Sequence, residues 1–197
     1  MIINHDPEFV ITLQRVIEFI GTFAFALSGI RLAASKHYDW LGGFVCGIAV
    51  AIGGGTIRDV MLGVRPFWML SPIYMICTLF AQCVVIVCHH YLRRLDTTWF
   101  LFDTLGLALF NIAGIQKTLE CGFPFWVAII MGCITGAAGG VIRDVLLNEE
   151  PVIFRKEIYA MACVVGGLTY WLLSWLQVSL YITVIATFAI VCAIRFL

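Results

Sequence analysis

An arginine-aspartate pair that follows a run of glycines occurs twice in this sequence, and the two copies are 85 positions apart. The first copy spans residues 53–59 and the second spans residues 138–144. Glycine weakens a helix by roughly 1 kcal/mol per residue relative to alanine, and a broken helix leaves backbone carbonyls free to bind a cation. At membrane depth, irregular backbone and charged side chains are tolerated chiefly inside protein or beside a watery cavity. The doubled segment therefore predicts a permeation path.

The glycines are expected to split each helix into two half-helices. The half that ends at the glycines would present carbonyls to a cation, and the half that begins there would present amide donors to an anion. Arg58 and Asp59 would then lie in the early turns of the second half, as would Arg143 and Asp144. Because adjacent helical residues do not face each other, pairing within each copy is disfavoured. We therefore predict that Arg58 pairs with Asp144 and Arg143 with Asp59.

Two other interpretations of these residues stay open. The charged side chains could extend to the membrane surfaces and only cap the helices. The glycines could serve close helix packing, since Gly-x-x-x-Gly spacing also occurs at Gly132, Gly136 and Gly140.

Other polar residues fall inside apolar stretches. Glu18 and Asp103 occupy equivalent places in the two copies, and Arg15 lies one helical turn before Glu18, where an ion pair is expected. Hydroxyl and amide side chains could supply oxygen ligands to a partly dehydrated cation. The candidate ion-path residues are Gly53, Gly54, Gly55, Thr56, Arg58, Asp59, Ala138, Gly139, Gly140, Arg143, Asp144, Ser28, Asn111 and Thr135.

The composition is that of an integral membrane protein. The chain has 197 residues, of which 62% are hydrophobic and 12% charged, and its mean hydropathy is +1.01. Globular domains average about 25% charged residues, so this chain has far fewer. Its formal net charge of zero gives no basis for a nucleic-acid partner. No nucleotide-binding or nucleophile motif is evident and the cysteines lack metal-ligand spacing, so we expect neither an enzyme nor a cofactor or metal.

Hydropathy predicts an all-α, polytopic protein with one membrane domain over residues 1–197. Each span needs about 20 residues to cross about 30 Å of hydrocarbon. We expect repeat one at 10–90, repeat two at 99–176 and an extra helix at 178–196. The predicted transmembrane helices lie near 10–31, 40–62, 68–90, 99–118, 124–147, 157–176 and 178–196.

The repeat extends well beyond the glycines. Residues 18–74 align with residues 103–159 without a gap, and 15 of these 57 positions are identical. Each unit holds three spans, an odd number, so the second unit must enter the membrane from the opposite face. The sequence therefore predicts a 3+3 inverted repeat with its pseudo-twofold axis in the membrane plane.

Lysine and arginine are unevenly divided between the two predicted faces. The face of the N-terminus holds two basic residues, Arg65 and Lys117, whereas the other face holds seven. The positive-inside rule then predicts an outside N-terminus and a cytoplasmic C-terminus. The seven are Arg31, Lys36, Arg93, Arg94, Arg155, Lys156 and Arg195.

The two glycine segments and the stretch 155–160 that enters the sixth span resemble prokaryotic members of the trimeric intracellular cation (TRIC) channel family. The resemblance covers nearly the whole chain. It implies a homotrimer in the prokaryotic inner (plasma) membrane, in contact with lipid, in which each subunit passes potassium or other monovalent cations between its two repeats. In that family the glycines kink the second and fifth helices, and Ala138 in place of a third glycine implies a milder second kink.

The chain also resembles bacterial relatives that are called glycine transporters. A secondary transporter for a small zwitterion such as glycine is therefore the alternative to a channel. A membrane scaffold without transport activity is a third interpretation, which broken helices in inverted repeats disfavour.

Overall fold

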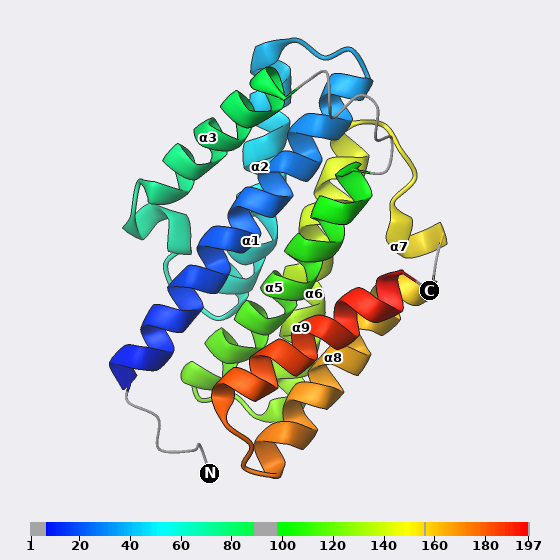
Figure 1. Ribbon diagram of the computed structural model, residues 1–197. Helices are drawn as coiled ribbons and strands as arrows, with labels where there is room; N and C mark the ends of the chain where they lie inside the picture. The colour runs from blue at the N-terminus through cyan, green and yellow to red at the C-terminus, as the bar shows by residue number, and fades with distance from the viewer. Residues whose placement is uncertain (1–6, 89–97, 156, 197) are drawn as a thin grey trace.

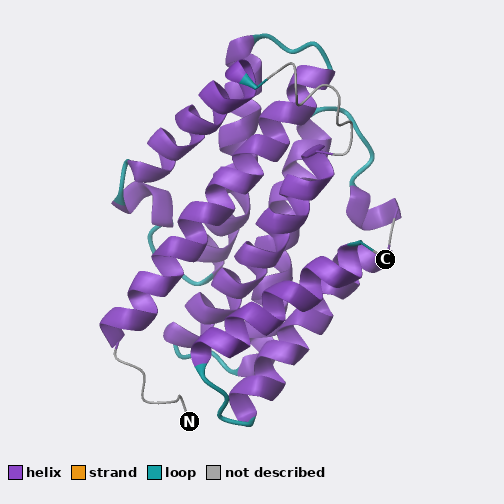
Figure 2. Ribbon diagram, viewed as in Figure 1, coloured by secondary structure: helices purple, strands orange, loops and turns teal. Residues whose placement is uncertain are grey.

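The computed structural model describes residues 7–88, 98–155 and 157–196, and the regular secondary structure in these ranges is helical (Figure 2). The helices are α1 (Pro7–Ser35), α2 (Trp40–Met61), the 3-10 helix η1 (Phe67–Leu70), α3 (Ile73–Val87), α5 (Thr98–Glu120), α6 (Phe125–Leu146), α7 (Val152–Arg155), α8 (Glu157–Trp175) and α9 (Leu180–Arg195).

A helix lies at each of the predicted transmembrane positions, although two of these helices are shorter than predicted. Helices α1, α2, α5, α6 and α8 are long and apolar enough to cross a membrane. Helix α3 has 15 residues and α9 has 16. Helix α3 falls short of its predicted span because the chain first forms η1 and then turns at Pro72, whose ring favours a helix start.

The two repeats run in opposite directions. In Figure 1, α1 rises, α2 descends and α3 rises again, whereas α5 descends, α6 rises and α8 descends. Helices α1, α2, α5 and α6 pack against one another at the centre, with α3 against α1 and α2, and α8 against α5 and α6. Helix α9 follows the second repeat and packs on α8 and α5. This is the predicted inverted repeat with one extra helix.

Helices α1 and α5 cross through equivalent residues of the two repeats. A methyl group added to Gly21 would lie 3.0 Å from the Phe110 ring, and one added to Gly106 would lie 2.4 Å from the Phe25 ring. The two phenylalanine rings stack with their centroids 5.3 Å apart. Since Phe25 and Phe110 are themselves 85 positions apart, this contact lies on the pseudo-twofold axis.

Helices α2 and α6 also cross on this axis, and there the glycines allow the two backbones to touch. A Cβ atom on Gly54 would lie 2.2 Å from the carbonyl oxygen of Thr135. The equivalent Cβ on Gly139 would lie 2.8 Å from the carbonyl oxygen of Val50. Both helices stay continuous through their glycines, so the predicted split into half-helices is wrong. Close packing at the crossing compensates for the low helix propensity of glycine.

Helices α2 and α6 end in the same kind of turn. Gly63, with φ of 71°, follows α2, and its counterpart Asn148, with φ of 53°, follows α6. Left-handed residues of this kind are common just beyond a helix C-terminus. Arg58 and Arg143 therefore lie in the last turns of their helices and not in the early turns of second half-helices, as predicted. Cations are favoured at this end of the helix dipole.

Several charges that predicted the membrane orientation do not lie on a free surface. Arg31 and Arg195 are buried, with 7% and 5% of their surface exposed. Arg93, Arg94 and Lys156 lie outside the described residues, as does part of the predicted span 68–90. The orientation therefore stays a prediction.

Candidate functional site

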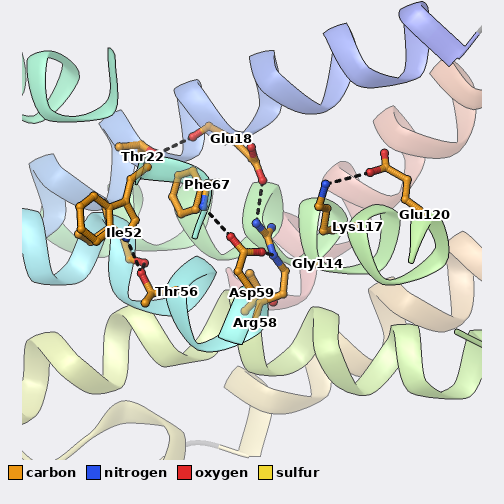
Figure 3. Close-up of polar contacts among 12 residues, drawn as sticks. Glu18, Thr22, Ile52, Thr56, Arg58, Asp59, Phe67, Gly114, Lys117 and Glu120 are labelled. Atoms are coloured by element: carbon orange, nitrogen blue, oxygen red, sulfur yellow. Dashed lines mark hydrogen bonds and ion pairs between the residues drawn. The ribbon is translucent and has the colours of Figure 1, made fainter. Parts of the chain in front are cut away.

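Four side chains from three helices form a buried charge cluster in repeat one, which we call cluster one: Glu18, Arg58, Asp59 and Tyr74. Arg58 donates from Nη2 to Glu18 Oε1 at 2.9 Å and from Nε to Asp59 Oδ1 at 2.7 Å (Figure 3). The Tyr74 hydroxyl donates to Glu18 Oε2 at 3.3 Å. The other Asp59 oxygen accepts the backbone N–H of Phe67 at 2.7 Å, which ties the start of η1 to the end of α2.

Repeat two contains an equivalent cluster, which we call cluster two: Asp103, Arg143, Asp144 and Tyr159. Arg143 Nη1 lies 2.5 Å from Asp103 Oδ1, and Arg143 Nε donates to Asp144 Oδ1 at 2.9 Å. The other Asp144 oxygen accepts the backbone N–H of Val152 at 3.0 Å. Each carboxylate, arginine and amide position in this cluster is the cluster-one position plus 85.

The predicted pairing between the repeats is therefore wrong. Arg58 and Arg143 each bind the aspartate next to them and an acidic residue of the same repeat, Glu18 or Asp103. The rule that helical neighbours do not face each other failed because the Nε of a long arginine side chain folds back onto the next residue near the helix end. Glu18 pairs with Arg58 and accepts from Tyr74, and within the residues that the structure describes no ion pair joins it to Arg15.

Neither arginine extends to a membrane surface. Arg58 and Arg143 are 0% exposed, and Asp59 and Asp144 are 1% and 3% exposed. The interpretation that these side chains reach out to lipid head groups is thus also wrong. Buried charges are costly unless they are paired and hydrogen-bonded, and in each cluster the arginine is paired with acidic residues of its own repeat.

One cation distinguishes the two clusters. Arg195, from α9, donates from Nη2 to Asp103 Oδ2 at 2.7 Å. Cluster two therefore combines two carboxylates with two guanidinium groups, whereas cluster one combines Glu18 and Asp59 with Arg58 alone.

Cluster one forms the floor of a cavity of about 910 Å³. The cavity is lined by the first half of α1, the segment from Val64 to Tyr74 and the end of α5. Glu18, Asp59 and Tyr74 face it from the protein interior, while Arg15 and Arg65 line it and are exposed. The cavity thus leads from the surface to the buried charges of repeat one.

Of the predicted oxygen ligands, Ser28, Asn111 and Thr135 are buried between the helices and Thr56 is half-buried. Ser28 accepts from Arg143 Nη1 at 2.8 Å and so joins cluster two. Thr135 donates to the Met131 carbonyl at 2.5 Å, and Thr56 donates to the Ile52 carbonyl at 2.7 Å (Figure 3). In Thr56 and Thr135 the hydroxyl proton is committed to the helix's own backbone, while the oxygen still has acceptor capacity.

Asn111 lies deeper in repeat two. It is fully buried and donates from Nδ2 to the Cys163 carbonyl of α8 at 3.3 Å.

The other predicted glycines contact side chains beside the crossing. A Cβ on Gly53 would lie 2.3 Å from Ile142, one on Gly55 would lie 2.4 Å from the Phe67 ring, and one on Gly140 would lie 2.3 Å from the Tyr159 hydroxyl. Ala138, half-buried, stands where the first run has Gly53.

Sequence reasoning did not assign Tyr74, Tyr159 and Arg195 to the site. The two tyrosines could have been found, because they are identical at equivalent repeat positions near the other cluster residues. No repeat pattern signals Arg195, since it follows the second unit and has no acidic partner nearby in the sequence.

The fold is that of the prokaryotic TRIC channels. The chain superimposes with a TM-score of 0.89 on the TRIC trimeric intracellular cation channel orthologue from Rhodobacter sphaeroides, at 31% identity over 94% of this chain and 96% of that one. It superimposes with a TM-score of 0.80 on a second TRIC cation channel, at 32% identity over 92% of this chain and 90% of that one.

The chain belongs to the glycine transporter family, whose profile matches it twice, at residues 15–90 and 100–175. These two matches begin 85 positions apart, as the predicted repeat requires. The chain is 41% identical to the inner membrane protein YadS of Escherichia coli K12, over 78% of this chain and 75% of the relative. It is 34% identical to the membrane protein YvgT of Bacillus subtilis, over 91% and 89%. These relatives are membrane proteins, as the composition predicts for this chain.

Proposed function

We propose that this protein is a channel for monovalent cations, permeable to potassium, with one pore in each subunit of a homotrimer in the inner membrane. The observation that carries the proposal is the structural similarity to TRIC cation channels over nearly the whole chain. The orientation proposed from the basic residues puts the N-terminus outside and the C-terminus in the cytoplasm.

The proposed path runs between the two repeats. It begins at the cavity above cluster one, where Glu18 and Asp59 offer carboxylate oxygens. It continues along the crossing of α2 and α6, past the glycines and the Thr135 hydroxyl, to Ser28 and cluster two. Carboxylate, hydroxyl and carbonyl oxygens are the groups that replace water around alkali cations in channels.

In this conformation the path is closed. Arg58 and Arg143 are fully buried, and the backbones touch at Gly54 and Gly139. A cation cannot pass two desolvated guanidinium groups without strong repulsion. Conduction therefore requires the arginines to move or the two helices to separate at their crossing.

A carrier for a small zwitterion is the second candidate function. It is favoured by the family's description as glycine transporters and by the cavity, which combines the exposed Arg15 and Arg65 with the carboxylate of Glu18 at its floor. An amino acid could place its carboxylate toward the arginines and its ammonium toward the floor.

Transport by purified protein in liposomes separates the two candidates. A channel predicts potassium efflux that is unaffected by glycine and proportional to the potassium gradient. A carrier predicts saturable uptake of labelled glycine without such efflux. Protein-free liposomes serve as the control, and uptake of glycine without potassium efflux would refute the channel.

A further inference from the structure

The guanidinium of Arg195 occupies a cation-binding position in repeat two. It comes from α9, outside both repeats, and is 5% exposed. Its guanidinium lies over the rings of Phe100 and Tyr159, 4.5 and 4.4 Å from their centroids, and donates to Asp103 at 2.7 Å. Such stacking of a guanidinium on aromatic faces, combined with a carboxylate partner, is a strong mode of cation recognition.

The same position in repeat one borders the cavity. The residues that hold Arg195 have counterparts in the cavity lining: Glu18 for Asp103, Tyr74 for Tyr159 and Arg15 for Phe100. In each cluster, one oxygen of this carboxylate binds the arginine of α2 or α6. The second Asp103 oxygen binds Arg195, whereas within the described part of the chain the second Glu18 oxygen accepts only a long 3.3 Å hydrogen bond from Tyr74.

Cluster one also lacks the charge that Arg195 supplies to cluster two. Glu18 and Asp59 share Arg58, which leaves one negative charge in excess. Lys117 lines the cavity but is paired with Glu120 at 3.3 Å. The exposed Arg15 and Arg65 are screened by water, so they offset a buried carboxylate only weakly.

We propose that Glu18 and Tyr74 form a binding site for a small cation that carries hydrogen-bond donors, a guanidinium or a primary ammonium, in the position that Arg195 occupies in repeat two. The cation donates to the Glu18 oxygen that accepts the long hydrogen bond from Tyr74 and packs against the Tyr74 ring. A cavity of about 910 Å³ admits such a cation together with water. The site follows from the pseudo-symmetry and does not depend on whether the protein conducts ions.

Calorimetric titration of the purified protein in detergent with methylguanidinium tests this proposal. We expect one saturable site per subunit and weaker binding of tetramethylammonium, which has the same charge but no donors. Glu18→Gln should weaken methylguanidinium binding by at least about tenfold, since it removes a charge-assisted hydrogen bond. Asp39→Asn is the matched control: it removes one exposed carboxylate outside the cavity, keeps a residue type that caps helix α2, and should leave the affinity unchanged within about twofold.

Arg195→Ala provides a second test that does not rely on the Glu18 variant folding. This truncation frees Asp103 and its two rings, so the number of methylguanidinium sites per subunit should rise from one to two. Absence of saturable binding to the unaltered protein, full binding by a folded Glu18→Gln variant, or equal binding of tetramethylammonium would each overturn the proposal. A single site in Arg195→Ala would overturn the equivalence of the two positions.

Discussion

Replacing Gly54 with alanine tests whether the glycines pack the two repeats together or act as hinges. The new methyl group would lie 2.2 Å from the Thr135 carbonyl oxygen. That oxygen belongs to a helix backbone, so it cannot rotate away as a flexible side chain would. Helices α2 and α6 would have to separate, and their contact lies at the centre of the protein.

The expected magnitude follows from two opposing effects. Overpacking a well-packed interior costs about 1–3 kcal/mol, and a clash with backbone belongs at the upper end of that range. Alanine regains about 1 kcal/mol of helix propensity relative to glycine. Gly54→Ala should therefore destabilise the protein by about 2 kcal/mol. Gly139→Ala, whose methyl group would lie 2.8 Å from the Val50 oxygen, should destabilise it less.

Gly43→Ala in the same helix is the matched control. Its methyl group would meet no atom closer than 3.9 Å, so it should be neutral or stabilise by up to about 1 kcal/mol. Equilibrium unfolding of the three variants in detergent measures these differences. If the glycines were hinges with free space around them, Gly54→Ala would stabilise the protein as much as Gly43→Ala, and that result would refute the packing argument.

Two further predictions concern the buried clusters. Arg58→Gln strands Glu18 and a neighbouring carboxylate without a cation, so it should lower the unfolding free energy by about 3–5 kcal/mol, while the exposed Arg65→Gln should change it by less than about 0.5 kcal/mol. A double-mutant cycle between Glu18→Gln and Arg58→Gln should give a coupling energy above about 1 kcal/mol, whereas the cycle between Arg58→Gln and Asp144→Asn should give less than about 0.5 kcal/mol. The reverse ranking would restore the pairing between repeats.

The repeat and its inversion could be predicted because they depend on periodic features of the sequence. Identities such as Phe25 with Phe110 recur at a fixed spacing, and an odd number of spans forces the second unit to be inverted. The helix positions could be predicted from hydropathy because apolar stretches are likewise a feature of the sequence itself. Helices α3 and α9 are shorter than expected and α1, with 29 residues, is longer. In α3 the reason is that hydropathy does not register a turn such as the one at Pro72.

The partners of the buried arginines could not be predicted from the sequence. They depend on where α2 ends, and the left-handed turn at Gly63 puts Arg58 in the last turn, within reach of Glu18. A run of glycines in the sequence is also equally compatible with a break in a helix and with a close contact between two helices. The distance between Gly54 and the Thr135 backbone distinguishes the two, and that distance belongs to the tertiary structure.

The central claim is that the path between the two repeats conducts cations, and single-channel recording tests it most directly. Purified protein in a planar bilayer should give discrete current steps in asymmetric potassium chloride, and the currents should reverse near the potassium equilibrium potential. The Arg58→Gln variant, which removes a buried cation from the proposed path, should change the step size if it folds. Saturable glycine uptake by protein that shows no unitary currents would contradict the account.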